Sequence, residues 1–214
     1  MNITELESLL KELRYHLFEK QKSEWERSLS FEDELFDRWE RANFLGFGEK
    51  TSIYQSSLVY GDVKVGKNTW IGPYTILDGS GGLEIGNNCS ISSGVQIYTH
   101  DTVEKRVSNG FSEVIREKTT IGNSCYIGPL SVIRKGIKIN NNSVVSALSY
   151  VNKEVPSYTV VAGTPAKVIG KIKLNKAKDV TFIFDKEHDQ MRSMQVEIIR
   201  LKKRLLHLEK QLEK

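Results

Sequence analysis

The feature that most constrains the fold is a six-residue period of aliphatic side chains. Fourteen Ile, Val and Leu residues keep this period, with a two-residue slip in the middle and one longer gap: Ile53, Val59, Val65, Ile71, Leu77, Ile85, Ile91, Ile97, Ile121, Ile127, Ile133, Ile139, Val145 and Val151. A period of six fits neither an α-helix nor an alternating strand. It predicts a solenoid in which each hexad forms a short parallel strand and a turn, and three hexads close one triangular coil.

The residues around these aliphatic anchors agree with a tightly wound coil. The fourth residue after most anchors is small or short, and five anchors are followed directly by glycine: Gly66, Gly72, Gly86, Gly122 and Gly128. The two cysteines, Cys89 and Cys125, both occupy the small fourth position. This placement favours buried thiols that fill corners of the coil over a disulfide or a reactive role.

Two segments carry a family resemblance: I-G-N-S-C-Y-I-G-P-L-S-V-I at 121–133, and V-N-K-E-V-P-S-Y-T-V-V-A-G-T-P-A-K-V-I-G at 151–170. They resemble the hexapeptide-repeat acyltransferases, and in particular the sugar O-acetyltransferases that include the maltose and galactoside enzymes. The resemblance covers about residues 50–172. It implies a left-handed parallel β-helix, acetyl-CoA as co-substrate, no required metal, and a trimer with each active site between two subunits.

The chain is expected to be mainly β, with a helical cap at 1–48, an acetyltransferase domain at 49–172, and a linker with a C-terminal helix at 173–214. A helix is predicted over 3–28, with Thr4 and Glu7 as a capping box. A second helix is predicted from Ser30–Asp33 to Gly46. Because the ends of solenoids need covering, we expect these helices to cap the first coil; acceptor binding is the alternative.

The repeat has one long interruption, and a histidine stands at its start. The hexads do not continue over 101–118, which predicts a loop that protrudes from the coil. Loops of this length in a compact domain are usually functional. The other three histidines lie in predicted terminal helices, so His100 is the only one in the solenoid. The family's catalytic histidine matches His100 in the run Y-T-H-D at 98–101.

An imidazole suits the chemistry that the resemblance implies. Direct acetyl transfer from a thioester to a hydroxyl requires a base near neutral pH, and we expect His100 to be that base. A backbone N–H in a turn is expected to stabilise the oxyanion. Asp101 is adjacent to His100 and should point away from it. The group that orients the imidazole stays open between a backbone carbonyl and an acid such as Glu113.

The resemblance also assigns the co-substrate residues. Gly128, Ser146 and Ala147 match small residues along the pantetheine arm of coenzyme A. Lys153 and Lys167 match basic residues that meet its phosphates, where positive charge suits an anionic nucleotide. The alternative for each lysine is an ordinary solvated surface side chain.

Two residues are candidates for binding the acceptor. Asp78 begins a glycine-rich corner at 78–82 and is expected to bind a sugar hydroxyl, with simple turn capping as the alternative. Tyr126 stands where the family usually has tryptophan, at a wall of the acceptor channel.

A second apolar pattern begins after Asp179. Its apolar residues are separated alternately by three and four positions: Met191, Met194, Ile198, Leu201, Leu205, Leu208 and Leu212. This seam predicts a coiled coil, and the trimeric family implies three strands. The alternative is an amphipathic helix docked on its own domain.

Composition limits the remaining possibilities. A net charge of +4 with acids and bases mixed does not indicate nucleic-acid binding, and no apolar run approaches a membrane span. The N-terminus does not read as a secretion signal, so a cytoplasmic location is expected. We predict an acetyl-CoA-dependent O-acetyltransferase acting on a sugar hydroxyl of a cell-surface polysaccharide or its precursor.

Three other functions deserve comparison. A nucleotide-amino-sugar N-acetyltransferase is the near alternative, and a non-catalytic trimeric assembly scaffold is a more distant one. A carbonic anhydrase on the same solenoid would need three histidine ligands around zinc, and one solenoid histidine cannot supply three distinct positions.

Overall fold

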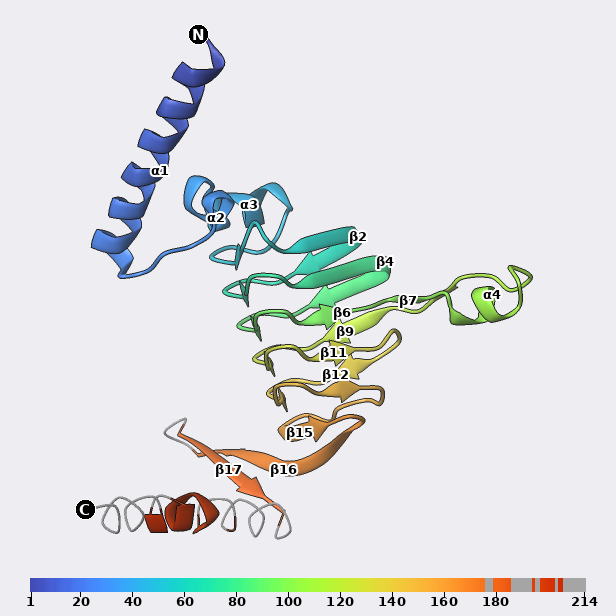
Figure 1. Ribbon diagram of the computed structural model, residues 1–214. Coiled ribbons are helices and arrows are strands. Elements are labelled where there is room, and N and C mark those ends of the chain that lie inside the picture. Colours follow the sequence, from blue (N-terminus) through green and yellow to red (C-terminus); the bar gives the residue numbers. More distant parts are fainter. Residues whose placement is uncertain (176–178, 186–193, 195–196, 203, 206–214) are drawn as a thin grey trace.

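The chain winds as a parallel β-helix with α-helices at its N-terminal end (Figure 1). The computed structural model describes residues 1–175, 179–185, 194, 197–202 and 204–205. Each coil crosses three faces in turn, which are called face A, face B and face C. The three corners between them are the A/B, B/C and C/A edges.

Face A is a stack of short strands that pair in parallel with the equivalent strand one coil away. These strands are β1 (Ser52–Ile53), β3 (Trp70–Ile71), β5 (Ser90–Ile91), β10 (Tyr126–Ile127), β13 (Val144–Val145) and β15 (Thr159–Gly163). Their anchors lie in register, since Ile127 pairs with Ile91 on one side and Val145 on the other.

Faces B and C are joined by two long strands, β2 (Leu58–Val65) and β4 (Ile76–Ile85), which bend around the B/C edge. Face B continues with β6 (Gln96–Ile97), β11 (Val132–Ile133) and β14 (Tyr150–Val151). Face C continues with β9 (Thr119–Ile121) and β12 (Lys138–Ile139), and Val155 bridges to Ile139. The two-residue slip in the hexads falls where β4 turns this edge.

The predicted anchors form the core. Thirteen of the fourteen belong to the buried hydrophobic set, and only Val59 in the first coil is partly exposed. Both cysteines are buried and free, as expected. The solenoid prediction from the six-residue period is therefore confirmed. The left-handed winding of the β-helix is implied by the family resemblance alone.

Truncating an anchor should destabilise the coil strongly. Ile133 is fully buried in face B, so Ile133→Ala removes packing on both sides of one coil. We expect a loss of about 2–5 kcal/mol in the free energy of unfolding, measured by urea denaturation. The exposed Lys138 on β12 provides the control, because Lys138→Ala should change stability by less than about 0.5 kcal/mol. Equal losses in both variants would contradict the assignment of the core.

The N-terminal helices differ in detail from the prediction. They are α1 (Ile3–Trp25), α2 (Phe31–Leu35) and α3 (Arg38–Phe44). The capping box of α1 is Asn2 with Glu5, whose backbone N–H donates to Asn2 Oδ1 at 2.9 Å. The predicted box of Thr4 and Glu7 was wrong, because α1 begins at Ile3 and Thr4 already lies in its first turn.

The second predicted helix is two helices. Phe36 adopts an extended conformation that ends α2, and the Asp37 side chain accepts bonds from the N–H groups of Trp39 and Glu40 to start α3. A carboxylate in this position caps a new helix.

The helix α3 lies over the first coil. Ala42 of α3 and Phe47 after it join the buried core. Arg41 donates to the carbonyls of Tyr54 and Ser57, which fastens α3 to the first coil. In contrast, α1 extends away from the solenoid and buries only Leu17 (Figure 1).

The interruption forms an arm that leaves the solenoid at the B/C edge of the third coil (Figure 1). Its root is a two-stranded antiparallel ribbon of β7 (His100–Asp101) and β8 (Ile115–Arg116), and between them lies α4 (Val103–Val107). The excursion predicted over 101–118 is thus present, with a short helix that the sequence pattern did not indicate.

The segment after the last coil was predicted as a linker but contains sheet. The strands β16 (Ala166–Leu174) and β17 (Val180–Phe184) extend face A by antiparallel pairing. Alternate residues of β17 are aromatic or aliphatic, which suits a strand rather than a polar bridge.

Part of the predicted coiled-coil seam lies within the described residues. Met194, Ile198, Leu201 and Leu205 are helical and exposed, whereas Met191, Leu208 and Leu212 lie outside the described residues. The coiled coil therefore stays a prediction.

Candidate functional site

The root of the arm brings together two residues that are 22 positions apart in the sequence. Asp78 lies on β4 in the second coil, and His100 begins the arm in the third. The Nδ1 atom of His100 is 2.6 Å from Oδ2 of Asp78. The stacking of adjacent coils at the B/C edge creates this pair, because Leu77 pairs with Ile97 across face B.

Asp78 is buried, with a side chain only 2% exposed, and its carboxylate is fully engaged. Oδ1 accepts bonds from the backbone N–H and hydroxyl of Ser80 at 3.0 and 2.5 Å, and Oδ2 accepts from the N–H of Thr99 at 2.8 Å. Burial by itself would raise the pKa of Asp78. The bonds from Ser80, Thr99 and His100 together outweigh burial and hold this pKa well below its ordinary value.

The ionisation of Asp78 decides which nitrogen of His100 carries a proton. An ionised carboxylate only accepts hydrogen bonds, so Nδ1–H of His100 must be the donor in the 2.6 Å contact. Nε2 of a neutral imidazole is then unprotonated. The His100 side chain is 36% exposed, and the described residues give Nε2 no hydrogen-bond partner. This geometry leaves a basic nitrogen available to a bound substrate.

Thr99 and Gly81 fasten the pair to the coil. The Thr99 hydroxyl donates to the backbone carbonyl of Asp78 and accepts from the N–H of Gly81, both at 2.8 Å. A Cβ atom at position 81 would lie 2.5 Å from the Thr99 carbonyl oxygen, so glycine permits this close approach. The glycine-rich segment is a corner of the solenoid, as predicted.

An ion pair between a buried lysine and an exposed glutamate holds the returning strand of the arm. Lys135, only 4% exposed in the fourth coil, donates to Oε1 of Glu117. The N–H of Glu117 donates in turn to the carbonyl of Thr99 at 2.9 Å. These contacts connect the third and fourth coils beside His100, and the sequence pattern had not singled out Glu117 or Lys135.

The placement of Asp78 differs from the expectation that it binds the acceptor. Its carboxylate points to His100 and is shielded from solvent, which makes it the group that orients the imidazole. Glu113, the acid considered earlier, is exposed on the arm. Asp101 accepts from the N–H of Val103 at 2.8 Å, a local role that agrees with its expected direction away from His100.

Three of the proposed co-substrate residues lie together at the A/B edge. Gly128 packs directly against Ser146 and Ala147 of the next coil, since a Cβ atom at position 128 would lie 2.4 Å from the Ala147 nitrogen. The close packing of adjacent coils is therefore enough to explain why position 128 is glycine. Ala147 is exposed and Ser146 is half-buried.

The other predicted residues are spread over the surface. Lys153 is exposed at the B/C edge, two coils beyond the arm, and Lys167 is exposed on β16. Tyr126 is 43% exposed on face A. A single chain therefore places Gly128, Ser146 and Ala147 one face away from His100.

Other features of the described residues lie apart from this site. A groove of about 620 Å³ crosses face C and contains none of the predicted site residues. No group of three metal-ligating side chains occurs in the part of the chain that the structure describes. Within the same residues, no helix is both long and apolar enough to cross a membrane.

Comparison with known proteins identifies the repeats. Residues 118–153 match the family model for bacterial transferase hexapeptide (six repeats), and residues 62–99 match the one for the hexapeptide repeat of succinyl-transferase. The galactoside O-acetyltransferase of Escherichia coli K12 is 37% identical over 92 residues, which are 42% of this chain and 44% of that enzyme. The chain thus matches less than half the length of this relative.

Solved structures extend the similarity over most of the chain. A maltose O-acetyltransferase from Clostridium difficile 630 is 28% identical with a TM-score of 0.52, covering 77% of this chain and 89% of that one. A hexapeptide-repeat acetyltransferase from Vibrio cholerae, complexed with acetyl-CoA, is 25% identical with a TM-score of 0.55, covering 76% and 88%. With its stacked hexads and acetyltransferase relatives, the chain is similar to the hexapeptide-repeat transferases over the matched residues.

Proposed function

We propose that this protein transfers an acetyl group from acetyl-CoA to a sugar hydroxyl, with His100 as general base and Asp78 as its positioning residue. The observation that carries the proposal is the 2.6 Å contact between Nδ1 of His100 and the buried carboxylate of Asp78. The similarity to galactoside and maltose O-acetyltransferases supports a sugar acceptor. We expect the acceptor to be a cell-surface polysaccharide or its precursor, acetylated in the cytoplasm.

The proposed reaction needs one base and no covalent enzyme intermediate. Nε2 of His100 removes the proton of the acceptor hydroxyl as its oxygen attacks the thioester carbonyl. The tetrahedral intermediate collapses, the C–S bond breaks, and the imidazolium returns the proton to the sulfur of coenzyme A. Asp78 stabilises the imidazolium through Nδ1–H, and its lowered pKa keeps it ionised during this cycle.

A second copy of the chain would complete the site. His100 lies at the B/C edge, whereas Gly128, Ser146 and Ala147 lie at the A/B edge. If the B/C edge of one copy faces the A/B edge of another, the imidazole and the pantetheine residues meet between them. This arrangement fits the homotrimer implied by the resemblance, with the C-terminal helices as a further contact between subunits. Lys153 and Lys167 would then supply positive charge for the phosphates.

The test measures release of coenzyme A from acetyl-CoA. The acceptors are methyl glycosides with free hydroxyls and, separately, nucleotide-linked amino sugars. Acceptor-dependent release with the hydroxyl sugars supports O-acetylation. Release confined to the amino sugars would replace the proposal with N-acetylation. Absence of both release and acetyl-CoA binding would indicate an assembly scaffold instead.

A further inference from the structure

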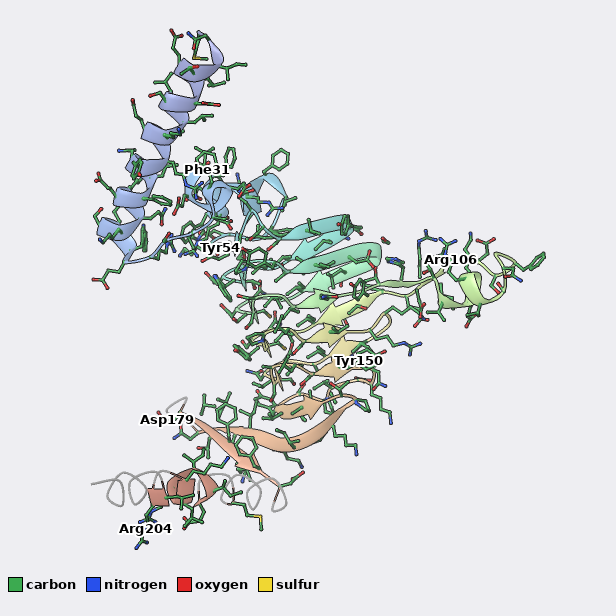
Figure 2. The ribbon with its side chains drawn as sticks, viewed as in Figure 1. Phe31, Tyr54, Arg106, Tyr150, Asp179 and Arg204 are labelled. Atoms are coloured by element: carbon green, nitrogen blue, oxygen red, sulfur yellow. The ribbon has the colours of Figure 1, made fainter. Side chains whose placement is uncertain are left out.

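A second pocket lies between the N-terminal helices and the first coil. It has a volume of about 240 Å³. The end of α1, the helices α2 and α3, and Tyr54 of the first coil form its walls. Tyr54 is labelled below α2 and α3 and beside the lower end of α1 in Figure 2. The pocket contains no residue of the His100 site, which lies at the B/C edge of the third coil.

Two buried polar atoms in this pocket have no partner among the described residues. The Glu34 residue is only 6% exposed; its Oε1 accepts from the N–H of Leu29 at 2.9 Å, but its Oε2 is unpaired. The Nε atom of Arg38 is likewise unpaired, although Nη1 donates to the hydroxyl of Tyr54 at 2.9 Å. Buried polar groups are normally satisfied, because an unpaired one costs roughly 1–3 kcal/mol. An acceptor and a donor together suit a ligand that carries hydroxyl groups.

The charges of the pocket are nearly balanced. The lining contains three cationic and four acidic side chains: Lys20, Arg27, Arg38, Glu24, Asp33, Glu34 and Asp37. Asp33 is occupied within the protein, since it accepts bonds from Gln55, Ser30 and Ser56. A lining of this kind offers no excess positive charge to an anion, so a phosphate or nucleotide is disfavoured.

Aromatic rings supply the remaining surface of the pocket. Trp25 and Trp39 are 53% and 39% exposed, and both line the pocket. The guanidinium of Arg38 lies 4.1 Å from the ring centroid of Trp39 and 5.3 Å from that of Tyr54, which holds it in place. Small-ligand sites typically combine aromatic walls with a few placed polar groups.

We propose that this pocket binds a neutral pyranose unit, as a carbohydrate site separate from the one at His100. A pyranose presents C–H faces that can pack on the tryptophans. Both atoms are closed off from the pocket in the unliganded protein, so the bound sugar would rotate the Glu34 and Arg38 side chains and let its hydroxyls donate to Oε2 and accept from Nε. The pocket would hold one sugar unit of a glycan by the N-terminal helices, whether or not acetyl transfer takes place elsewhere on the molecule.

Tryptophan fluorescence provides the test, because two of the three tryptophans line the pocket. The full chain is titrated with methyl glycosides of glucose, galactose, mannose and N-acetylglucosamine, and separately with inorganic phosphate. We expect a saturable change for at least one glycoside, with Kd in the roughly millimolar range, and none for phosphate. The variant His100→Ala should titrate like the wild type, so the result does not depend on the proposed acetyl transfer.

Variants then locate the bound sugar. Glu34→Gln keeps the bond to Leu29 but replaces the unpaired acceptor with an N–H donor, and should raise Kd about tenfold. Trp25→Ala should also weaken binding. Glu40→Gln and Phe44→Ala are matched controls, because both residues are exposed on α3 and lie outside the pocket lining.

Several results would overturn the proposal. One is saturable binding with an unchanged Kd in both Glu34→Gln and Trp25→Ala, which would locate the sugar elsewhere. Others are the absence of saturation with every glycoside, and a saturable response to phosphate. Circular dichroism checks folding; if Glu34→Gln does not fold, Trp25→Ala decides, because its half-exposed ring stands at the end of α1.

Discussion

Replacing His100 with alanine is expected to lower kcat for acetyl transfer to a hydroxyl acceptor by about 10²- to 10⁴-fold. The reason is that a hydroxyl must lose its proton as it attacks, and Nε2 of His100 is the unprotonated nitrogen of a ring held by Asp78. Steady-state release of coenzyme A measures the effect. The KM for acetyl-CoA should change little, because the residues proposed to bind coenzyme A do not include His100.

A matched histidine substitution controls for this experiment. His16 is exposed on α1, and His16→Ala should leave kcat unchanged. Full activity of His100→Ala on every acceptor would refute the histidine mechanism. A loss that is large with hydroxyl acceptors and small with amine acceptors would favour N-acetylation, because a free amine is already nucleophilic.

Replacing Asp78 with asparagine is expected to lower kcat by roughly 10²- to 10⁴-fold as well. The amide can donate a hydrogen bond to Nδ1, which shifts the proton of His100 to Nε2 and removes the base. Because Asp78 is buried behind His100, the KM values for both substrates should stay close to those of the wild type. A raised acceptor KM with an unchanged kcat would instead restore the role first expected of Asp78, direct contact with the sugar.

The same substitution should affect stability in a pH-dependent way. The folded pKa of Asp78 is lowered below its unfolded value of about 3.9, so its ionised form stabilises the fold at pH values above 3.9. That contribution is lost as the pH falls through the folded pKa. The difference in unfolding free energy between wild type and Asp78→Asn should therefore be larger at pH 7 than at pH 3, as measured by urea denaturation.

An exposed aspartate at the same edge controls for the loss of charge. Asp62 lies on β2 in the first coil and forms only an exposed ion pair with Lys64 at 3.7 Å. Asp62→Asn should leave both kcat and stability nearly unchanged. Equal effects in the two variants would show that charge at this edge, and not the contact with His100, determines the result.

The hexad period alone was sufficient to predict the solenoid and its core. Each anchor faces inward because six residues carry the chain to the equivalent position on the next face of a three-sided coil. The break in the period likewise located the arm over 101–118. The resemblance of the Y-T-H-D run added the expected role of His100, which the period by itself does not imply.

The exact start and end of each helix in the N-terminal cap were harder to predict. Asn2 and Thr4 both suit an N-cap, and the choice of Asn2 depends on where the first turn closes. The break at Phe36 depends on how α3 packs over the first coil through Arg41 and Ala42. Local residue preferences differ by too little to decide between such alternatives.

The sequence by itself determined which side chains face the core of this protein and where the coil is interrupted. Only the tertiary structure decided which outward side chains meet, because that depends on the stacking of coils whose lengths differ. The register of β4 against β6 brings Asp78 beside His100, and the bend of the chain around three faces separates His100 from Gly128 and Ala147. Contacts between residues a coil apart arise from packing, so no local pattern contains them.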